Sequence, residues 1–195
     1  MTGRLLLATT NVGKQQELRR LLAGLPAEIV TPDEIGLSLE VDEPHDTYAE
    51  NAAAKADAFA RASGMVALAD DSGIEVAALG WGPGVRSARW GQGRNAERVR
   101  EAVGDAPDRR ARMVCVLAVA RPSKPIPRVD LFTGVVEGTV APEPRGSGGF
   151  GYDPIFLLPG GRTMAELPEG AKDELSHRGR AVAAAMPLLR ELLAE

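Results

Sequence analysis

The chain has a single cysteine, few aromatic residues and no excess of positive charge. Of its 195 residues only Cys115 carries a thiol, so no internal disulfide can form, as is usual in a reducing cytoplasm. Aromatic residues make up 4% of the chain, and the net charge at pH 7 is −4. A broad nucleic-acid-binding face needs clustered basic charge. We therefore expect no nucleic acid as a partner, although a local group of cations can still bind one nucleotide.

Long hydrophobic runs are also absent. No apolar stretch approaches the roughly 20 residues of a membrane-spanning helix, and the first residues do not have the layout of a secretion signal. The chain contains no internal repeat and no low-complexity tract. With 44% hydrophobic and 26% charged residues, we expect a cytoplasmic globule with a sizeable core and no membrane partner. Within it, Cys115 lies in the apolar run 113–117 and is predicted to be a core residue rather than a reactive thiol.

The spacing of apolar residues predicts an α/β fold, with a mixed sheet and flanking helices, as a single domain over residues 1–195. Thr47 and Glu50 have the spacing of a capping box, and Gly64 marks the end of that helix. Pro187 is expected to kink the last helix. Residues 122–127 are expected to join two antiparallel strands. Strands are predicted at 4–8, 28–31, 65–69, 112–120, 129–140 and 155–158, and helices after Gly13 and at 47–62, 95–103 and about 173–193.

Two segments resemble phosphate-binding motifs without fulfilling them. The glycines of 146–151 have the spacing G-x-G-x-x-G, but such a fingerprint must follow a strand and open a helix, and here residues 153–154 and an apolar run follow. The residues alone leave open a backbone that closes over a ligand and a plain mobile loop. The segment 8–15 is not a P-loop, because Ala8 replaces the first glycine and Gln15 replaces the Ser or Thr.

The turn before the first predicted helix is a candidate anion site. Thr10, Asn11 and Lys14 lie between a predicted strand and a helix N-terminus. Free N–H groups and the positive end of the helix dipole favour an anion there. An ordinary solvated turn is the alternative.

Two adjacent acids, Asp70 and Asp71, follow an apolar strand. Their mutual repulsion costs stability unless a cation neutralises them, and ligand sites of α/β sheets gather at strand ends. A helix-capping turn is the alternative, and it accounts for only one of the acids. Asp42 and Glu43 supply further carboxylates. A hard cation such as Mg2+ takes one or two carboxylates together with phosphate oxygens.

Near the start of the last predicted helix, His177 stands beside Arg178. A solvent-facing polar patch is the alternative to a binding role. A hydrolytic dyad of Ser176 and His177 is disfavoured, because adjacent helical side chains do not face each other and no nucleophile-elbow motif is present. Lys172, five residues before the histidine, adds a further candidate phosphate contact.

Together these segments resemble the inosine triphosphate pyrophosphatase family, hydrolases that remove non-standard purine nucleotides. The order and spacing match over nearly the whole chain, and no core motif is missing. The resemblance implies an elongated α/β fold of two lobes around a central cleft, a homodimer, and Mg2+-dependent cleavage of a triphosphate to a monophosphate and pyrophosphate. The matching segments are Thr10-Asn11-x-x-Lys14, Glu50-Asn51-Ala52-x-x-Lys55-Ala56, Asp70-Asp71-Ser72-Gly73, Pro83-Gly84-x-x-Ser87-Ala88-Arg89, Gly148-Gly149-Phe150-Gly151-Tyr152-Asp153-Pro154 and Ser176-His177-Arg178-Gly179.

The resemblance also implies roles for individual residues. Asp71 matches the catalytic acid, which activates water and helps to hold the metal, and Glu43 matches a second metal-binding acid, with Asp42 as the alternative. Three lysines match phosphate contacts, and residues 150–153 with 177–178 match the pocket for the base. The substrate-binding set is Thr9, Thr10, Asn11, Val12, Gly13, Lys14, Lys55, Ser72, Phe150, Gly151, Tyr152, Asp153, Lys172, His177 and Arg178, with Lys14, Lys55 and Lys172 as the phosphate contacts.

We therefore expect an enzyme that hydrolyses inosine triphosphate, its deoxy form and xanthosine triphosphate. One alternative is a pyrophosphatase of modified pyrimidine nucleotides, and another is a non-catalytic nucleotide-binding regulator on the same fold. The adjacent acids Asp70 and Asp71 favour an enzyme, since a protein that only binds anions gains nothing from them. A panel of nucleotides separates the expected purine enzyme from the pyrimidine enzyme.

Overall fold

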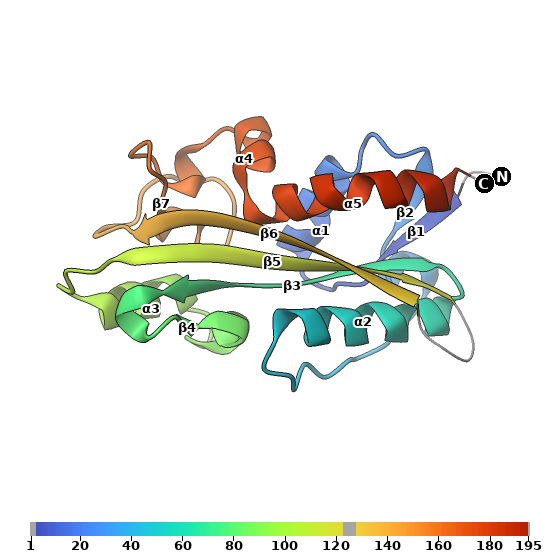
Figure 1. Ribbon diagram of the computed structural model, residues 1–195, viewed down its shortest axis with the longest axis horizontal. Coiled ribbons are helices and arrows are strands. Elements are labelled where there is room, and N and C mark those ends of the chain that lie inside the picture. The colour runs from blue at the N-terminus through green and yellow to red at the C-terminus, as the bar shows by residue number, and fades with distance from the viewer. Residues whose placement is uncertain (1–2, 123–127, 195) are drawn as a thin grey trace. The chain divides into compact units, whose positions relative to one another are not determined.

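The computed structural model describes residues 3–122 and 128–194, and it confirms an α/β fold in which helices flank a mixed sheet (Figure 1). The strands are β1 (Gly3–Leu7), β2 (Ala27–Val30), β3 (Val66–Val76), β4 (Gly82–Pro83), β5 (Arg110–Arg121), β6 (Arg128–Val140) and β7 (Phe156–Leu157). Over the described residues they lie in the order β2-β1-β3-β5-β6-β7, with β4 paired to β3. β1 runs parallel to β2 and β3, whereas the β3–β4 and β6–β7 pairs are antiparallel. The sheet is therefore mixed, as predicted.

The α-helices lie between and after these strands in the sequence. They are α1 (Val12–Leu21), α2 (Tyr48–Ser63), α3 (Asn95–Val103), α4 (Glu169–Leu175) and α5 (His177–Leu193). Short 3-10 turns occur at Asp33–Ile35, Ala77–Leu79, Gly84–Arg89, Asp153–Ile155 and Met164–Glu166. The predicted helix at 95–103 is confirmed with the same bounds. None of the helices in the described part of the chain combines the length and apolarity that crossing a bilayer requires.

The chain forms two compact units. The first unit contains the residues up to Asp71, Val116–Thr133 and the residues from Ala181 onward, and the second contains Ser72–Cys115 and Gly134–Arg180. The chain passes from one unit to the other within β3, β5, β6 and α5. Every crossing is therefore made inside a strand or a helix.

The first unit is built on the parallel strands β1 and β3. Leu5, Leu6 and Leu7 have no exposed surface, as expected for a strand that is covered on both faces. Leu18 and Leu22 on α1 are equally buried, which confirms the helical spacing seen in the sequence. In this unit α2 lies on one side of the sheet and α1 on the other (Figure 1).

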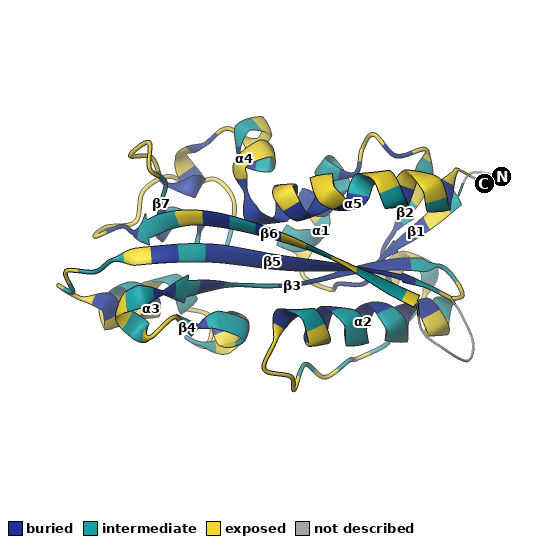
Figure 2. Cartoon of the chain, viewed as in Figure 1, coloured by how far each residue is buried: buried dark blue, intermediate teal, exposed yellow. Residues whose placement is uncertain are grey.

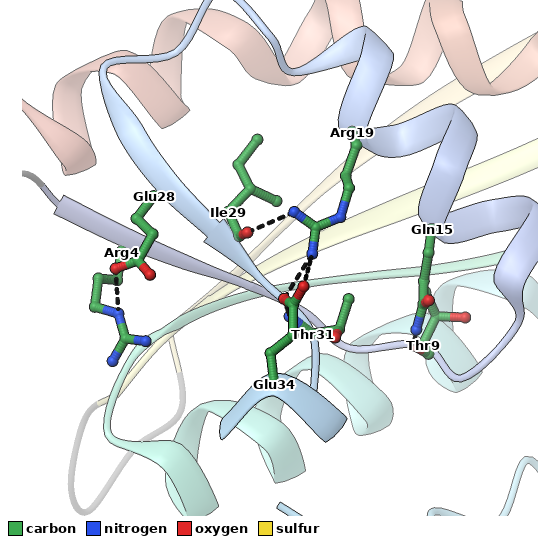
Figure 3. Close-up of polar contacts among 8 residues, drawn as sticks. All are labelled: Arg4, Thr9, Gln15, Arg19, Glu28, Ile29, Thr31 and Glu34. Atoms are coloured by element: carbon green, nitrogen blue, oxygen red, sulfur yellow. Dashed lines mark hydrogen bonds and ion pairs between the residues drawn. The ribbon is translucent and has the colours of Figure 1, made fainter. Parts of the chain in front are cut away.

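Arg19 anchors α1 to the end of β2 (Figure 3). Its guanidinium donates to the backbone oxygen of Ile29 at 2.8 Å and to both carboxylate oxygens of Glu34 at 2.7 and 2.6 Å. The same carboxylate accepts the backbone N–H of Thr31 at 2.8 Å. The pKa of Glu34 is lowered, first by the Thr31 hydrogen bond and then by Arg19. Because Arg19 lies in the last turn of α1, these contacts hold the end of the helix that is opposite to its N-terminal turn.

The ends of α2 follow the predicted signals, with one difference. The Thr47 side chain accepts the backbone N–H of Glu50 at 3.2 Å, and Gly64 ends the helix in a left-handed conformation with φ +70°. A capping box would direct the Glu50 carboxylate to the backbone of Thr47. Here that carboxylate accepts a hydrogen bond from the Thr47 hydroxyl at 2.6 Å, so the two side chains bond to each other.

Three other local predictions were wrong. β3 does not end before Asp70 but continues to Val76. It neighbours β5 in the sheet, and its last two residues also pair with β4. The single helix predicted from residue 173 is two helices, α4 and α5, which meet at Ser176. Between the predicted strand at 65–69 and the predicted helix at 95–103, where no further strand was expected, the structure also has β4 and helical turns. The connection expected at 122–127 lies outside the described residues apart from its first residue.

The second unit has its own apolar core, which includes Ile74, Met113, Val136 and Phe156. β5 is buried along most of its length, as Figure 2 shows, and Cys115 on it has no exposed surface. The prediction of a core cysteine is confirmed. The thiol is therefore part of the packing of this strand.

The glycine-rich segment 146–151 packs against the turn at Met164–Glu166. A side chain at Gly146 would come within 2.5 Å of the Ala165 backbone, and the Gly148 N–H donates to the Ala165 oxygen at 3.0 Å. These glycines serve a close approach between two backbones within the second unit. Residues 141–145 separate them from β6, and no α-helix begins there, so the prediction that they are no dinucleotide fingerprint is confirmed.

Candidate functional site

The turn at the N-terminus of α1 is held by an interlocked set of hydrogen bonds. The Thr9 hydroxyl accepts the Asn11 N–H at 3.2 Å. The Gln15 side-chain amide donates to the backbone oxygen of Thr9 at 2.7 Å (Figure 3). Asn11 is the N-cap, and its side chain accepts the Lys14 N–H at 3.0 Å. Thr10 and Val12 are exposed and Gly13 is half-buried. A fixed, solvent-facing helix N-terminus of this kind favours an anion.

The two adjacent acids of β3 have different partners on different helices. The carboxylate of Asp70 lies 3.0 Å from the Lys14 ammonium on α1, whereas that of Asp71 accepts the Asn51 amide of α2 at 3.1 Å. Successive side chains of a strand point to opposite faces of the sheet, and α1 and α2 cover opposite faces here (Figure 1). The two carboxylates therefore have separate surroundings, and the cation beside Asp70 is the Lys14 ammonium.

The carboxyl group of Asp71 is perturbed by its burial. It is only 6% exposed, and burial raises the pKa of its carboxyl above the ordinary value of 3.8. The hydrogen bond from Asn51 opposes this rise, whereas the negative charge of Glu43 adds to it. The positive charges of Lys14 and Lys55 lower the pKa to a smaller extent. A carboxylate whose pKa is moved toward neutrality is better suited to accept a proton.

α2 holds the acidic loop that precedes it. Lys55 forms an ion pair with Glu43. One turn earlier, Asn51 exchanges hydrogen bonds with the backbone of His45, accepting the N–H at 3.1 Å and donating to the oxygen at 3.2 Å. Asn51 therefore connects the loop to Asp71 while being 1% exposed. It was absent from the predicted site residues, although its position four residues before Lys55 puts both on one helix face.

The donor set suits a hard cation that brings further ligands with it. Among residues 3–122 and 128–194, no group of three or more His, Cys, Asp or Glu side chains is arranged to hold a metal. Glu43 lies near enough to Asp71 for its negative charge to raise the pKa of Asp71. Two carboxylates completed by phosphate oxygens and water are the usual environment of Mg2+. The residues therefore fit Mg2+ bound together with a phosphate ligand, and they do not fit a closed protein cage.

In the second unit, a buried ion pair organises the aromatic loop. The Lys172 ammonium lies 2.7 Å from the Asp153 carboxylate, and both side chains are 5% exposed. The same carboxylate oxygen accepts the Phe150 N–H at 2.8 Å. Gly149 has φ +70°, and a side chain there would come within 2.0 Å of that oxygen. The loop therefore closes around the carboxylate of Asp153, and Gly149 is required for the approach.

Two cationic side chains lie over the aromatic ring of Phe150. The ring centroid is 5.1 Å from the Lys172 ammonium and 5.6 Å from the guanidinium carbon of Arg178, distances at which cations are attracted to an aromatic face. Arg178 is 2% exposed and donates to the Ser72 hydroxyl at 2.9 Å. The structure thus brings Ser72, Phe150, Asp153, Lys172 and Arg178 together as one group.

Tyr152 and Gly151 lie beside this group. The Tyr152 hydroxyl donates to the Ser87 oxygen at 2.8 Å, and burial raises the pKa of this tyrosine to about 12. Ser87 in turn bonds the backbone of Ile74 on β3. Gly151 is exposed. Tyr152 therefore holds its loop to the rest of the second unit.

The junction of α4 and α5 explains the spacing of the last motif. The Ser176 hydroxyl accepts the Gly179 N–H at 3.0 Å and so caps α5. A side chain at Gly179 would come within 1.7 Å of the Asp173 carbonyl oxygen. His177, the first residue of α5, is 8% exposed. The pattern of serine and glycine is thus a helix junction that fixes the positions of His177 and Arg178.

The predicted residues fall into two groups by unit. The group in the first unit is centred on Asp71, which accepts a hydrogen bond from Asn51 and feels the charges of Glu43, Lys14 and Lys55. Within it, Lys14 pairs with Asp70 and Lys55 pairs with Glu43. The turn beside Lys14 carries Thr9, Thr10, Asn11, Val12 and Gly13. In the second unit, the aromatic loop and the α4–α5 junction form the other group. Asn51 is the addition that the structure makes to the predicted site, and Asp70 is placed in it as the partner of Lys14.

Solved structures define the class of fold. A HAM1 protein from Coxiella burnetii superposes with a TM-score of 0.84 at 39% identity, over 97% of this chain and 99% of that chain. The Ham1 protein of Staphylococcus aureus gives 0.83 at 34% identity, over 96% and 98%. The sequence profile of the Ham1 family matches residues 5–188. A protein of Symbiobacterium thermophilum named dITP/XTP pyrophosphatase is 49% identical over 199 residues, which cover 98% of both chains. The chain belongs to the Ham1 family, and the family predicted from its motifs is confirmed.

Proposed function

We propose that this protein hydrolyses non-standard purine nucleoside triphosphates, namely inosine triphosphate, its deoxy form and xanthosine triphosphate, to the monophosphate and pyrophosphate. The observation that carries the proposal is the buried carboxylate of Asp71, with a raised pKa, beside Glu43 and within electrostatic reach of two lysines. The name dITP/XTP pyrophosphatase, carried by the relative from Symbiobacterium thermophilum at 49% identity, supports the choice of substrates.

Asp71 is the proposed general base. Its carboxylate would take a proton from the water that attacks the α-phosphorus, and the bond between the α-phosphorus and the bridging oxygen would break. Asn51 donates to one carboxylate oxygen at 3.1 Å and so fixes the orientation of the group. Lys14 and Lys55 supply positive charge for the phosphate chain and the leaving pyrophosphate. Mg2+, held by Glu43 and Asp71 with phosphate oxygens, would offset the remaining charge.

The second group of residues is the proposed recognition site for the base. Phe150 offers a ring on which any base can stack. Arg178 only donates hydrogen bonds and His177 can donate one, which suits the carbonyl oxygen that hypoxanthine and xanthine carry at the six position. Lys172 is the proposed third phosphate contact. The family resemblance further leads us to propose a cytoplasmic homodimer, with residues 1–195 as one catalytic domain.

The experiment that tests the function is a product analysis across a nucleotide panel. Inosine triphosphate and xanthosine triphosphate are expected to give the monophosphate and pyrophosphate by chromatography, with much slower turnover of adenosine, guanosine and modified pyrimidine triphosphates. Inosine diphosphate with orthophosphate as the first products would contradict the proposed cleavage site. Preferred turnover of a modified pyrimidine would favour the alternative enzyme class.

Activity is expected to require a divalent cation, with Mg2+ sufficient. Excess chelator should abolish turnover, and added Mg2+ should restore it. The fold should survive the treatment, because Lys14 and Lys55 already neutralise Asp70 and Glu43 without a metal. Hydrolysis and thermal melting measured with and without chelator check both statements. Full turnover in excess chelator would contradict the metal assignment.

Arg178→Ala is expected to lower the preference for inosine over adenosine triphosphate by about tenfold or more. A donor facing the amino group of adenine is left unpaired, which costs about 1–3 kcal/mol, and removing the arginine removes that penalty. The measurement is the ratio of kcat/KM for the two nucleotides, which partial unfolding of the variant does not change.

Arg180→Ala is the matched control, because this exposed arginine lies two residues further along α5 and donates to the Val135 backbone oxygen at 2.7 Å. Its nucleotide preference should equal that of the unmodified protein. An unchanged ratio in Arg178→Ala would remove that residue from base recognition.

A further inference from the structure

Asp70 is the one acid of the first group that the proposed reaction does not use. Its side chain has no exposed surface, and it points to the face of the sheet opposite to Asp71. A buried carboxylate is costly unless a cation and hydrogen bonds compensate it. Its cation is the Lys14 ammonium, 3.0 Å from the Oδ2 atom. This buried ion pair between Asp70 and Lys14 therefore raises the question of what Asp70 contributes to the site.

Lys14 is fixed at both ends by this arrangement. Its backbone N–H donates to the Asn11 side chain that caps α1, and its ammonium is fixed by Asp70. The lysine side chain nevertheless remains 17% exposed, so it is held in place without being sealed from solvent. A free lysine is a flexible point charge that loses rotamer freedom when it binds, and prior fixation reduces that loss.

We propose that Asp70 is a positioning residue, which holds the ammonium of Lys14 ready for the phosphate chain of the substrate. The inference rests on the proposed function, since it takes Lys14 as a phosphate contact. It assigns Asp70 neither to the metal nor to proton transfer, because its carboxylate acts only through the lysine. The charge of Lys14 also reaches Asp71, which connects the fixed ammonium to the group that activates water.

The test is a double-mutant cycle read by the binding of inorganic pyrophosphate, a measurement that needs no turnover. Asp70→Asn is expected to weaken pyrophosphate binding by about tenfold when Lys14 is present, a typical coupling for two residues in contact. In the Lys14→Met background the same change should alter binding less than about twofold. Equal effects of Asp70→Asn in both backgrounds, or no effect in the first, would overturn the proposal.

Glu34→Gln is the matched control. It also converts a carboxylate to an amide in an ion pair that anchors α1, here with Arg19, but this pair is remote from the N-terminal turn. If Asp70 merely stabilised α1, both amide variants would weaken pyrophosphate binding alike, and that result would contradict the positioning role. An unchanged affinity in Glu34→Gln beside a tenfold loss in Asp70→Asn supports it.

A measurement on the unmodified protein covers the case in which Asp70→Asn does not fold. Nitrogen-15 NMR of lysine ammonium groups should show a signal protected from solvent exchange without any ligand, and this signal should be missing in Lys14→Met. Rapid exchange of the Lys14 ammonium would overturn the proposal. If the unmodified protein binds no pyrophosphate, both the proposed function and the role of Asp70 are contradicted. If it binds pyrophosphate but Asp70 and Lys14 show no coupling in the mutant cycle, only the role of Asp70 is refuted.

Discussion

Asp71→Asn is expected to lower the hydrolysis of inosine triphosphate by about 10²- to 10⁴-fold, the usual effect of losing a general base. The substitution replaces one oxygen by nitrogen at nearly constant volume, and the Asn51 amide can still donate to the remaining oxygen. Packing around this 6% exposed position is therefore preserved. Steady-state kinetics with inosine triphosphate and Mg2+ give the loss directly.

The stability of the same variant provides the control. Because the pKa of Asp71 is raised, the folded protein binds this proton more tightly than the unfolded chain. Ionisation of Asp71 therefore destabilises the fold as the pH rises through the folded-state pKa. The melting temperature of Asp71→Asn at pH 7, without metal, should equal or exceed that of the unmodified protein, and the difference should disappear below pH 3.8, the ordinary pKa. A folded variant that keeps most of its activity would exclude Asp71 as the base.

Gly179→Ala is expected to cause the largest loss of stability from a single methyl group, at least about 3 kcal/mol in the free energy of unfolding. The new Cβ would lie 1.7 Å from the carbonyl oxygen of Asp173. That oxygen belongs to the backbone of α4, so no side-chain rotation can relieve the contact. The two helices must separate at their junction, and Ser176 would lose its position as the cap of α5. Urea unfolding at equilibrium measures the change.

Gly170→Ala is the matched control for that experiment. This glycine also lies in a helix, α4, and a Cβ added there meets nothing within 4 Å. Alanine has the higher helix propensity, by up to about 1 kcal/mol, so this variant should be as stable as the unmodified protein or slightly more stable. Equal unfolding free energies for Gly179→Ala and Gly170→Ala would contradict the close approach at the helix junction.

Local sequence signals predicted the elements but not where strands continue. The helix at 95–103 was predicted with its observed bounds. The end of α2 was predicted from the glycine at position 64, which adopts the left-handed conformation in the structure. The extension of β3 beyond Asp70 depends on strands that come later in the chain, since β5 neighbours it in the sheet and β4 pairs with its last two residues. A strand that carries acids in its interior has no local signature, since acids are unfavourable in strands without a partner.

The candidate site shows the same division between local and distant information. Individual residues such as Asp71, Lys14 and Lys55 were identified by motif. Their partners were not, because the ion pair of Lys14 with Asp70 and the hydrogen bond of Asn51 to Asp71 join segments far apart in the sequence. The same holds for Asp153 and Lys172, each of which was predicted to contact substrate and which form a buried pair with each other.

The alternation of side chains along β3 also constrains how the length of the chain can change during evolution. Deleting or inserting one residue between Val66 and Asp70 would turn every later side chain of the strand to the other face. The carboxylate now facing α1 would then face α2, and both acids would lose their partners at once. The segment 37–42 has no helix or strand, and there a change of length leaves this alternation intact. Related sequences should therefore vary in length before α2 and stay constant in length along β3.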